Sequence, residues 1–191
     1  MKLLFLRHGQ TNWNLENKIQ GSSDTMLNDH GIEQAKKLAE NILKSNYNIC
    51  KIYTSKQMRA IDTAKILSLY MTVDYEIVEG LEEINFGEWE GLSWNEIKDK
   101  FPEEYTEWCN NRRYSKSHQG ESYQEMLERV LKVIKNIISK NRENVIVVTH
   151  SGVIMALQCY LTKTSFSDIG NFRLDNMSVC ELDKEVFDNY I

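Results

Sequence analysis

Two histidines follow apolar segments at the places where buried strands should end. His8 comes after residues 3–6 in the run LLFLRHG, and His150 comes after residues 145–149 in the run VIVVTHSG. Parallel strands joined by right-handed crossovers bring their carboxyl ends to one edge of a sheet, where ligands bind in open α/β folds. A single histidine at such a place is more often structural. Two at equivalent strand ends favour a functional pair whose imidazole groups meet.

Two arginines at the same kind of position predict that the ligand is an anion. Arg7 stands directly before His8, and Arg59 lies in the first turn after the second expected strand. Guanidinium groups hold phosphate oxygens bidentately and can stay with them as charge spreads in a loose transition state. The flanking Gly9 and Gly152 are expected to let backbone amides approach the anion closely. The net charge of the chain is -5, so the positive field of this site would be local.

His8 and a nearby carboxylic acid are the candidate reactive groups. An imidazole that is neutral at one nitrogen is a competent nucleophile and can accept a phosphoryl group. A leaving alkoxide needs a proton, which the pair Glu82 and Glu83, after the strand expected at 75–78, can supply before acting as base on water. His150 would bind the transferring group. These residues predict hydrolysis of a phosphomonoester without a metal or another cofactor.

Composition restricts the class of protein. The chain has 191 residues, of which 41% are hydrophobic and 27% charged, and this predicts one globular domain over residues 1–191. Apolar stretches are far too short to span a membrane, and residues 3–6 are too short for the core of a signal peptide, so we expect a cytoplasmic protein. The net negative charge argues against nucleic acid as a partner. Four widely spaced cysteines without a C-x-x-C pair predict neither a zinc site nor disulfides.

The order of the expected elements predicts an α/β fold. Strand-like segments occur at 2–6, 49–54, 75–78, 145–149 and 178–182. Helices are expected at about 29–44, 56–69 and 123–139, with Asn28 as a cap and with capping boxes beginning at Ser93 and Ser122. This alternation is typical of βαβ units. Residues 80–120 contain no convincing strand but three of the four tryptophans, which predicts a helical insertion over the edge of the sheet.

These residues resemble a known family over nearly the whole chain and in the right order. The family is the histidine phosphatase superfamily, in its phosphoglycerate-mutase-like branch. The motifs that carry the resemblance are Arg7-His8-Gly9-x-Thr11-x-Trp13-Asn14, Gln20-Gly21, Leu27-x-x-x-Gly31-x-x-Gln34-Ala35, Thr54-Ser55-x-x-x-Arg59-Ala60, Leu81-x-Glu83-x-x-Phe86-Gly87-x-Trp89-Glu90-Gly91, Gly120-Glu121-Ser122 and Thr149-His150-Ser151-Gly152. The resemblance implies a three-layer α/β/α sandwich with a mostly parallel central sheet, and a phosphohistidine intermediate on His8.

The resemblance also implies a role for individual residues. Arg7, Arg59 and His150 would form the phosphate pocket. Glu83, not Glu82, would be the proton donor, because the pattern of the family is Leu-x-Glu. Positions that would contact the substrate are Asn14, Gln20, Gly21 and Ser151.

The resemblance covers both phosphatases and cofactor-dependent phosphoglycerate mutases. The chain is short, has Gln20-Gly21 where mutases tend to have Gly-Trp, and lacks a proline-rich stretch after Arg113, all of which favour a phosphatase. Two short stretches, Tyr105-x-x-Trp108-Cys109-Asn110 and 171–175, are similar to α-ribazole phosphatases of cobalamin biosynthesis.

Several alternatives stay open. Arg112 and Arg113 are either solvated or read a substrate carboxylate, and His118 either faces solvent or reaches the site. A mutase is the alternative function. A non-catalytic domain that binds a phosphorylated ligand or a protein is a further one, although all the expected catalytic side chains are present. The expected partner is a small-molecule phosphomonoester, and the protein is expected to be a monomer or a homodimer.

Overall fold

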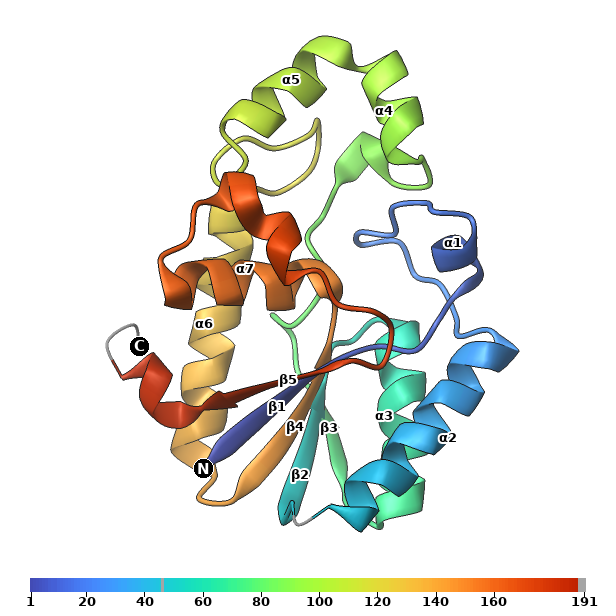
Figure 1. Ribbon diagram of the computed structural model, residues 1–191, viewed down its shortest axis with the longest axis vertical. Helices are drawn as coiled ribbons and strands as arrows, with labels where there is room; N and C mark the ends of the chain where they lie inside the picture. The colour runs from blue at the N-terminus through green and yellow to red at the C-terminus, as the bar shows by residue number, and fades with distance from the viewer. Residues whose placement is uncertain (46, 189–191) are drawn as a thin grey trace.

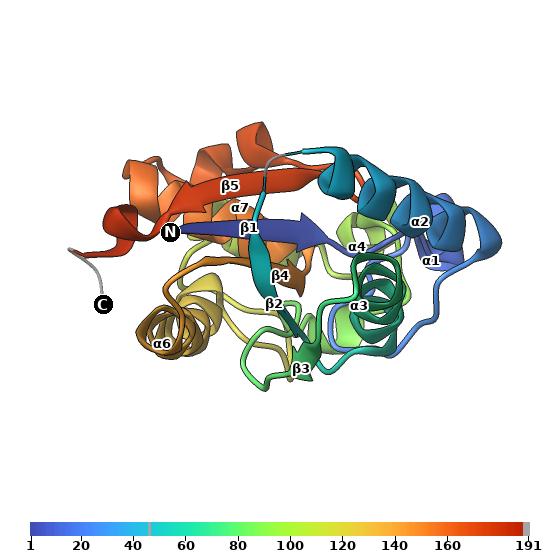
Figure 2. The same ribbon diagram turned by 90° about the horizontal axis from the view of Figure 1, so that it is seen from below.

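The computed structural model describes residues 1–45 and 47–188, which form a five-stranded sheet with helices on both faces (Figures 1 and 2). The strand order is β3-β2-β4-β1-β5. The strands are β1 (Lys2–Arg7), β2 (Ile49–Thr54), β3 (Tyr75–Ile77), β4 (Asn144–Thr149) and β5 (Val179–Asp183). Only β5, at one edge, is antiparallel to its neighbour. The expected α/β sandwich with a mostly parallel sheet is therefore confirmed.

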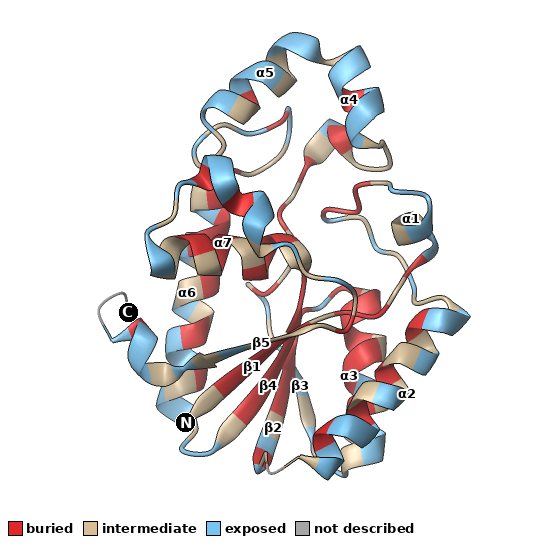
Figure 3. Cartoon of the chain, in the orientation of Figure 1, coloured by how far each residue is buried: buried red, intermediate tan, exposed pale blue. Residues whose placement is uncertain are grey.

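The central strands β1 and β4 are buried on both faces, and their register places the two histidines together. Leu4 pairs with Ile146, and Arg7 pairs with Thr149 at the last step. A strand that is covered on both faces reads as a continuous apolar run, which is why residues 3–6 and 145–148 do not alternate with polar residues. The strands appear as the buried centre of the molecule in Figure 3. Since both strands end in step, the residues that follow them are neighbours.

Four longer helices cover the sheet, two on each face (Figure 2). They are α2 (Asp29–Lys44) and α3 (Met58–Met71) on one face, and α6 (Tyr123–Lys140) and α7 (Ser151–Thr162) on the other. The expected caps are present: Asn28 accepts a hydrogen bond from the amide of Gly31, and Ser122 begins a capping box. Helix α3 begins two residues later than expected. The amide of Ser55 still pairs with the carbonyl of Val148, and the backbone of Gln57 is still extended, with φ -76° and ψ 136°, so the helix begins only after it.

The expected helical insertion lies beyond the carboxyl ends of the parallel strands (Figure 1). Residues 80–120, all of them described, contain no strand; their elements are the 3₁₀ helix η1 (Gly87–Trp89), α4 (Trp94–Lys100) and α5 (Pro102–Asn110). Trp89 is fully buried and its ring centroid lies 5.5 Å from that of Trp108. The ring centroid of Trp108 also lies 6.3 Å from that of Tyr123 in helix α6, so aromatic contacts join the insertion to the rest of the fold.

The remaining helices are short. They are α1 (Asn12–Leu15) in the loop after β1, and the 3₁₀ helices η2 (Phe166–Phe172) and η3 (Lys184–Phe187) near the carboxyl end. In the described part of the chain, no helix combines the length and the apolar character that crossing a membrane requires.

The loop after His8 crosses the first turn of α2 at a contact between two backbones. A Cβ atom on Gly31 would lie 2.2 Å from the carbonyl oxygen of Gln10, and one on Gly9 would lie 2.7 Å from the carbonyl oxygen of Gly31. Neither carbonyl belongs to a flexible side chain that could move away. The two glycines thus allow α2 to lie directly against the segment that carries His8.

We expect Gly31→Ala to lower the free energy of unfolding by roughly 1–3 kcal/mol, as overpacking does, although alanine favours a helix by about 1 kcal/mol over glycine. Urea unfolding measures this change. Gly170→Ala is the matched control, because an added Cβ there meets no atom within 4 Å. A Gly31→Ala variant as stable as the wild type would contradict the close approach of the two backbones.

Candidate active site

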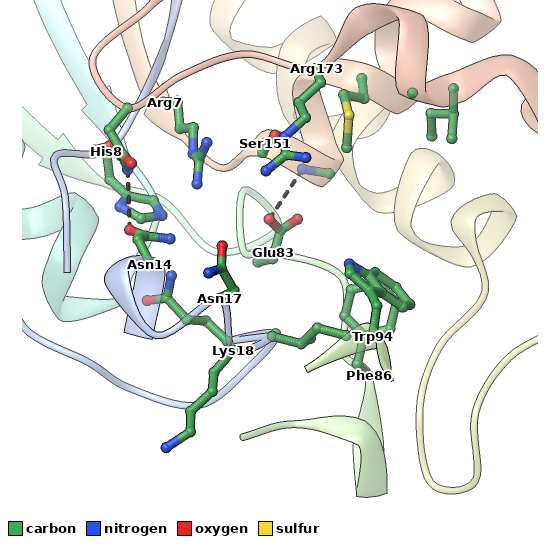
Figure 4. Close-up of a pocket in the computed structure, with 18 of the residues that line it drawn as sticks. Arg7, His8, Asn14, Asn17, Lys18, Glu83, Phe86, Trp94, Ser151 and Arg173 are labelled. Carbon is green, nitrogen blue, oxygen red and sulfur yellow. Dashed lines mark hydrogen bonds between the residues drawn. The ribbon is translucent and has the colours of Figure 1, made fainter. Parts of the chain in front are cut away.

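A pocket of about 650 Å³ lies between the carboxyl ends of the strands and the insertion (Figure 4). The predicted site residues that line it are Arg7, His8, Asn14, Gln20, Gly21, Arg59, Glu83 and Ser151. His150 lies behind them, with its ring centroid 5.2 Å from that of His8. The structure therefore brings together residues from every strand end that the sequence singled out.

His8 is buried, and its hydrogen bonds define which nitrogen is free. Its Nδ1 atom lies 2.7 Å from the carbonyl oxygen of Gly9, which can only accept a hydrogen bond, so Nδ1 carries the proton. The carbonyl of His8 in turn accepts a hydrogen bond of 2.9 Å from Asn176. Burial, together with the charges of Arg59 and Arg7, lowers the pKa of His8 well below the usual 6.5. The ring is therefore neutral at neutral pH and presents the lone pair of Nε2.

His150 is fully buried and has one free nitrogen. Its Nε2 atom lies 2.9 Å from the hydroxyl oxygen of Ser55, whereas Nδ1 has no hydrogen-bond partner among the described residues. Burial, and then the charge of Arg59, lowers the pKa of His150 well below its usual value. When the Ser55 hydroxyl donates its bond to Nε2, the proton of His150 resides on Nδ1. That nitrogen is then a donor for an anion.

Backbone carbonyls orient both arginines. The two terminal nitrogens of Arg59 donate to the carbonyls of Ser23, at 2.7 Å, and Gly21, at 2.8 Å. Arg7 donates to the carbonyl of Leu174 at 2.6 Å. Burial lowers the pKa of Arg59 to about 10, so it remains charged at neutral pH. Two positive charges thus lie beside the neutral His8 ring.

Glu83 presents a carboxyl group on the opposite side of the pocket from His8 (Figure 4). Its two oxygens accept hydrogen bonds of 3.1 Å each from the amides of Gly152 and Ile84. Burial raises the pKa of this carboxyl group above the usual 4.5, against the opposite effect of these two hydrogen bonds. A Cβ atom on Gly152 would lie 2.5 Å from a Glu83 oxygen, so the first turn of α7 needs glycine there. The arrangement favours a carboxylic acid that can give up a proton inside the pocket.

Comparison with known proteins identifies the family. A model described as the histidine phosphatase superfamily (branch 1) matches residues 3–187. The chain belongs to the histidine phosphatase superfamily.

Two curated relatives of this histidine phosphatase chain are named phosphatases. The metal-independent phosphoserine phosphatase of Arabidopsis thaliana is 32% identical over 185 residues, which cover 95% of this chain and 76% of the relative. The adenosylcobalamin/alpha-ribazole phosphatase of Escherichia coli K12 is 28% identical over 176 residues, which cover 92% and 86%.

A solved structure is similar to this chain over nearly its whole length. The mycobacterial glucosyl-3-phosphoglycerate phosphatase in complex with VO3 matches with a TM-score of 0.84 at 28% identity, over 95% of this chain and 90% of that one. The predicted family, fold class and enzyme class, a phosphatase, are confirmed.

In this histidine phosphatase, Gly9 and Gly152 do not offer their own amides to the anion, contrary to the expectation from the sequence. The amide of Gly9 donates to the hydroxyl of Thr63 at 3.0 Å, and the amide of Gly152 donates to Glu83 at 3.1 Å. Both amides are therefore already hydrogen-bonded within the protein and do not face the pocket as free donors. The lack of a side chain at these positions instead permits close packing.

Three other candidates lie apart from the pocket. A carboxylate oxygen of Glu82 lies 3.5 Å from Arg129 and accepts the amide of Gly80. His118 is exposed, with its Nε2 atom 3.9 Å from Glu88. Arg113 donates to Gln124 at 2.8 Å and packs against aromatic rings. Of the adjacent pair, only Arg112 lines the pocket, with its guanidinium 4.5 Å from the ring centroid of Trp108.

The structure adds residues that sequence reasoning did not place in the site. Arg173, Asp175 and Asn176 line the pocket from the segment before β5. The rule of strand ends could not find them, because β5 is antiparallel and its beginning, not its end, lies at this edge of the sheet. Gln57 could have been found, since it lies three residues after the end of β2; its side chain accepts a hydrogen bond from the amide of Glu83 at 2.9 Å.

Within residues 1–45 and 47–188, no three or more histidine, cysteine, aspartate or glutamate side chains come together as a group that could hold a metal ion. The charges that lower the pKa of His8 are those of the cations Arg59 and Arg7. The local field favours an anionic ligand.

The lowered pKa values of His8 and His150 make stability depend on pH. The unfolded chain takes up protons on these residues as the pH falls below 6.5, while the folded chain does not, so the free energy of unfolding should fall. The slope is at most about 1.4 kcal/mol per pH unit for each histidine.

In His8→Asn one of the two buried histidines is gone, and urea unfolding at a series of pH values below 6.5 should show a smaller slope. His30→Gln, which alters an exposed histidine, is the control and should keep the slope of the wild type. An unchanged slope in His8→Asn would mean that His8 protonates as easily in the folded chain as in the unfolded one.

Proposed function

We propose that this histidine phosphatase is a metal-independent phosphomonoesterase that acts through a phosphohistidine on His8. The observation that carries the proposal is the state of the His8 ring, which is neutral, with Nδ1 bound to Gly9 and with Nε2 free. A nucleophile of this kind between two guanidinium groups suits a dianionic phosphate, because the cations offset the repulsion between the lone pair and the oxygens.

In the first step, Nε2 of His8 forms a bond to phosphorus while the ester P–O bond breaks. The alkoxide leaves with the proton of the Glu83 carboxyl group, whose raised pKa keeps that proton available. Arg7, Arg59 and Nδ1 of His150 hold the phosphoryl oxygens as charge spreads over them.

In the second step, a water molecule attacks phosphorus and the N–P bond breaks. The Glu83 carboxylate takes a proton from this water, which restores the starting acid. Inorganic phosphate leaves, and His8 returns to its neutral form. Asn14, Gln20, Gly21 and Ser151 line the space around the phosphate and the adjoining part of the substrate. A small-molecule phosphomonoester is the partner that this scheme requires.

A phosphoglycerate mutase is the alternative reading of the same groups. It would have to keep a phosphorylated intermediate away from water until transfer. The pocket is bordered by exposed side chains such as Trp94 and Arg173, so water has access, and the two curated relatives described above are named phosphatases. These observations support hydrolysis over transfer.

We propose α-ribazole 5′-phosphate as the substrate, on the basis of an aromatic wall. Phe86, Trp94, Tyr105 and Trp108 line the part of the pocket under the insertion, and 40% of the Trp94 surface is exposed. A flat base can stack on such rings. The E. coli relative named adenosylcobalamin/alpha-ribazole phosphatase supports this choice.

A second candidate substrate is O-phosphoserine, which a separate observation favours. Arg173, whose backbone is extended, and Asp175, two residues further on, line the same pocket. Among the described residues, neither side chain has a hydrogen bond or an ion pair, and both are exposed. A cation and an anion left unpaired beside the phosphate site suit the carboxylate and ammonium groups of an amino acid. The relative from A. thaliana is named a phosphoserine phosphatase.

Replacement of His8 tests the reaction. His8→Ala should accumulate no acid-labile phosphoenzyme when ³²P-labelled substrate is added and quenched with alkali, and its kcat should fall by on the order of 10³–10⁶-fold, as for other lost nucleophiles. His30→Ala, at an exposed histidine, should label like the wild type. Labelling of His8→Ala at the wild-type level would rule out His8 as the phosphoryl acceptor.

A substrate panel tests specificity. We expect a higher kcat/KM for α-ribazole 5′-phosphate than for O-phosphoserine, and Trp94→Ala should raise KM for the former by about 5- to 100-fold, the range of base stacking. The same change should leave KM for O-phosphoserine unaltered.

A preference for O-phosphoserine that Arg173→Gln abolishes would instead support the second candidate. Inclusion of 3-phosphoglycerate, with separate assays for free phosphate and for 2-phosphoglycerate, identifies a mutase.

A further inference from the structure

A carboxylate in the insertion fastens the loop that holds Arg59. We propose that Glu90 is a positioning residue for Arg59: it acts through the peptide units of residues 21–23 and thereby sets the orientation of a guanidinium that binds the phosphoryl group. This inference rests on the proposed function, because it assigns Glu90 a part in that reaction.

Both oxygens of Glu90 accept hydrogen bonds from the loop. One accepts from the amide of Ser22 at 2.6 Å and from its hydroxyl at 2.8 Å. The other accepts from the amide of Ser23 at 2.9 Å and from its hydroxyl at 2.6 Å. The amide of Phe86 adds a fifth bond of 3.1 Å. A carboxylate with this many short bonds holds the loop far more firmly than one contact would.

The opposite side of the same loop faces Arg59. Its carbonyls at Gly21 and Ser23 accept the two terminal nitrogens of Arg59 at 2.8 and 2.7 Å. The carbonyl of Gly21 and the amide of Ser22 belong to one planar trans peptide, so they point in opposite directions. Glu90 therefore binds one end of a peptide dipole whose other end binds Arg59. Hydrogen bonds in such a chain polarise and strengthen one another.

The backbone of Gly21 is adapted to Glu90. Its φ is +51°, in the left-handed region, and a Cβ atom there would lie 2.1 Å from a Glu90 oxygen. No other residue type leaves room for the carboxylate to reach the loop. Gly21 is expected from the sequence to contact the substrate. Its lack of a side chain also leaves room for the carboxylate of Glu90.

Further hydrogen bonds connect the Glu90 loop with Glu83, and the charge of Glu90 acts on Arg59. The side chain of Gln57 donates to the carbonyl of Gly21 at 2.8 Å and accepts the amide of Glu83 at 2.9 Å. The negative charge of Glu90 also opposes the burial that lowers the pKa of Arg59. Glu90 thus lies at one end of a connected set of bonds that reaches both Arg59 and Glu83.

A positioning role predicts a particular pattern of kinetic change. Since Arg59 contacts the phosphoryl group and not the alcohol, Glu90→Gln should lower kcat/KM for all phosphomonoesters by the same factor, about 10- to 100-fold, the scale of a misplaced electrostatic contact. Affinity for vanadate and for inorganic phosphate should fall as well. Glutamine keeps the size of the side chain but replaces one acceptor oxygen with a donor.

The control and a double variant separate positioning from stability. Glu125 accepts the amide and hydroxyl of Ser122 at 2.7 and 3.0 Å in the same manner, away from the pocket, so Glu125→Gln should keep kcat/KM within about twofold, as for surface substitutions. Lysine cannot bridge the two loop carbonyls as arginine does. In a protein that already carries Arg59→Lys, adding Glu90→Gln should therefore lower kcat/KM by less than about threefold, because the effects of coupled residues are not additive.

Two results would overturn the inference. One is a Glu90→Gln enzyme that melts earlier but keeps the kcat/KM and vanadate affinity of the wild type. The other is a double variant in which Glu90→Gln lowers kcat/KM by the same factor with Arg59→Lys as it does with Arg59. If Glu90→Gln does not fold, Ser23→Ala removes a single donor to Glu90 and should still lower phosphate affinity. A wild-type protein that binds vanadate but hydrolyses no phosphomonoester would count against the proposed function, while the affinity measurements would still test Glu90.

Discussion

The burial of the Arg59 charge is the constraint on which much of this structure depends. A guanidinium that is removed from water is costly unless its donors are hydrogen-bonded. Loop 20–25 supplies the carbonyls of Gly21 and Ser23 to the two terminal nitrogens of Arg59, while the Nε atom of Arg59 has no hydrogen-bond partner among the described residues. The loop is itself held by Glu90 and Gln57. The left-handed Gly21 and the two serines of this loop connect Glu90 in the insertion with this one cation. The same hydrogen bonds fix the orientation of the Arg59 guanidinium.

The same burial has opposite effects on the acid and on the bases of the pocket. Desolvation disfavours the charged form of any group, so it lowers the pKa of His8 and His150 and raises that of Glu83. A neutral imidazole and a protonated carboxyl group are the two forms that phosphoryl transfer to histidine requires. Hydrogen bonds oppose the effect of burial: the one to the carbonyl of Gly9 raises the pKa of His8, and the one from the amide of Gly152 lowers the pKa of Glu83. Desolvation alone thus favours the uncharged forms of both the proposed nucleophile and the proposed acid.

Backbone geometry determines how closely these groups meet. Strands β1 and β4 end in step, which places His8 and His150 with ring centroids 5.2 Å apart. Gly9 and Gly31 let helix α2 contact the loop after His8, and Gly152 lets helix α7 contact Glu83. At Gly9 and Gly31 the contact is with backbone atoms, and at Gly152 it is with the hydrogen-bonded carboxyl group of Glu83. The close contacts at these glycines therefore determine how near the elements around the pocket lie to one another.

The sequence by itself determined the alternation of strands and helices, because burial on both faces leaves continuous apolar runs and capping boxes mark where helices begin. It also determined which strand ends carry His8, Arg59, Glu83 and His150, since parallel strands share an edge. Only the tertiary structure decided that Gly9 and Gly152 use their amides within the protein, that Arg112 and not Arg113 reaches the pocket, and that Arg173 and Asp175 enter it. These outcomes depend on contacts between segments far apart in the chain, and on the reversed direction of β5, which no local pattern of residues encodes.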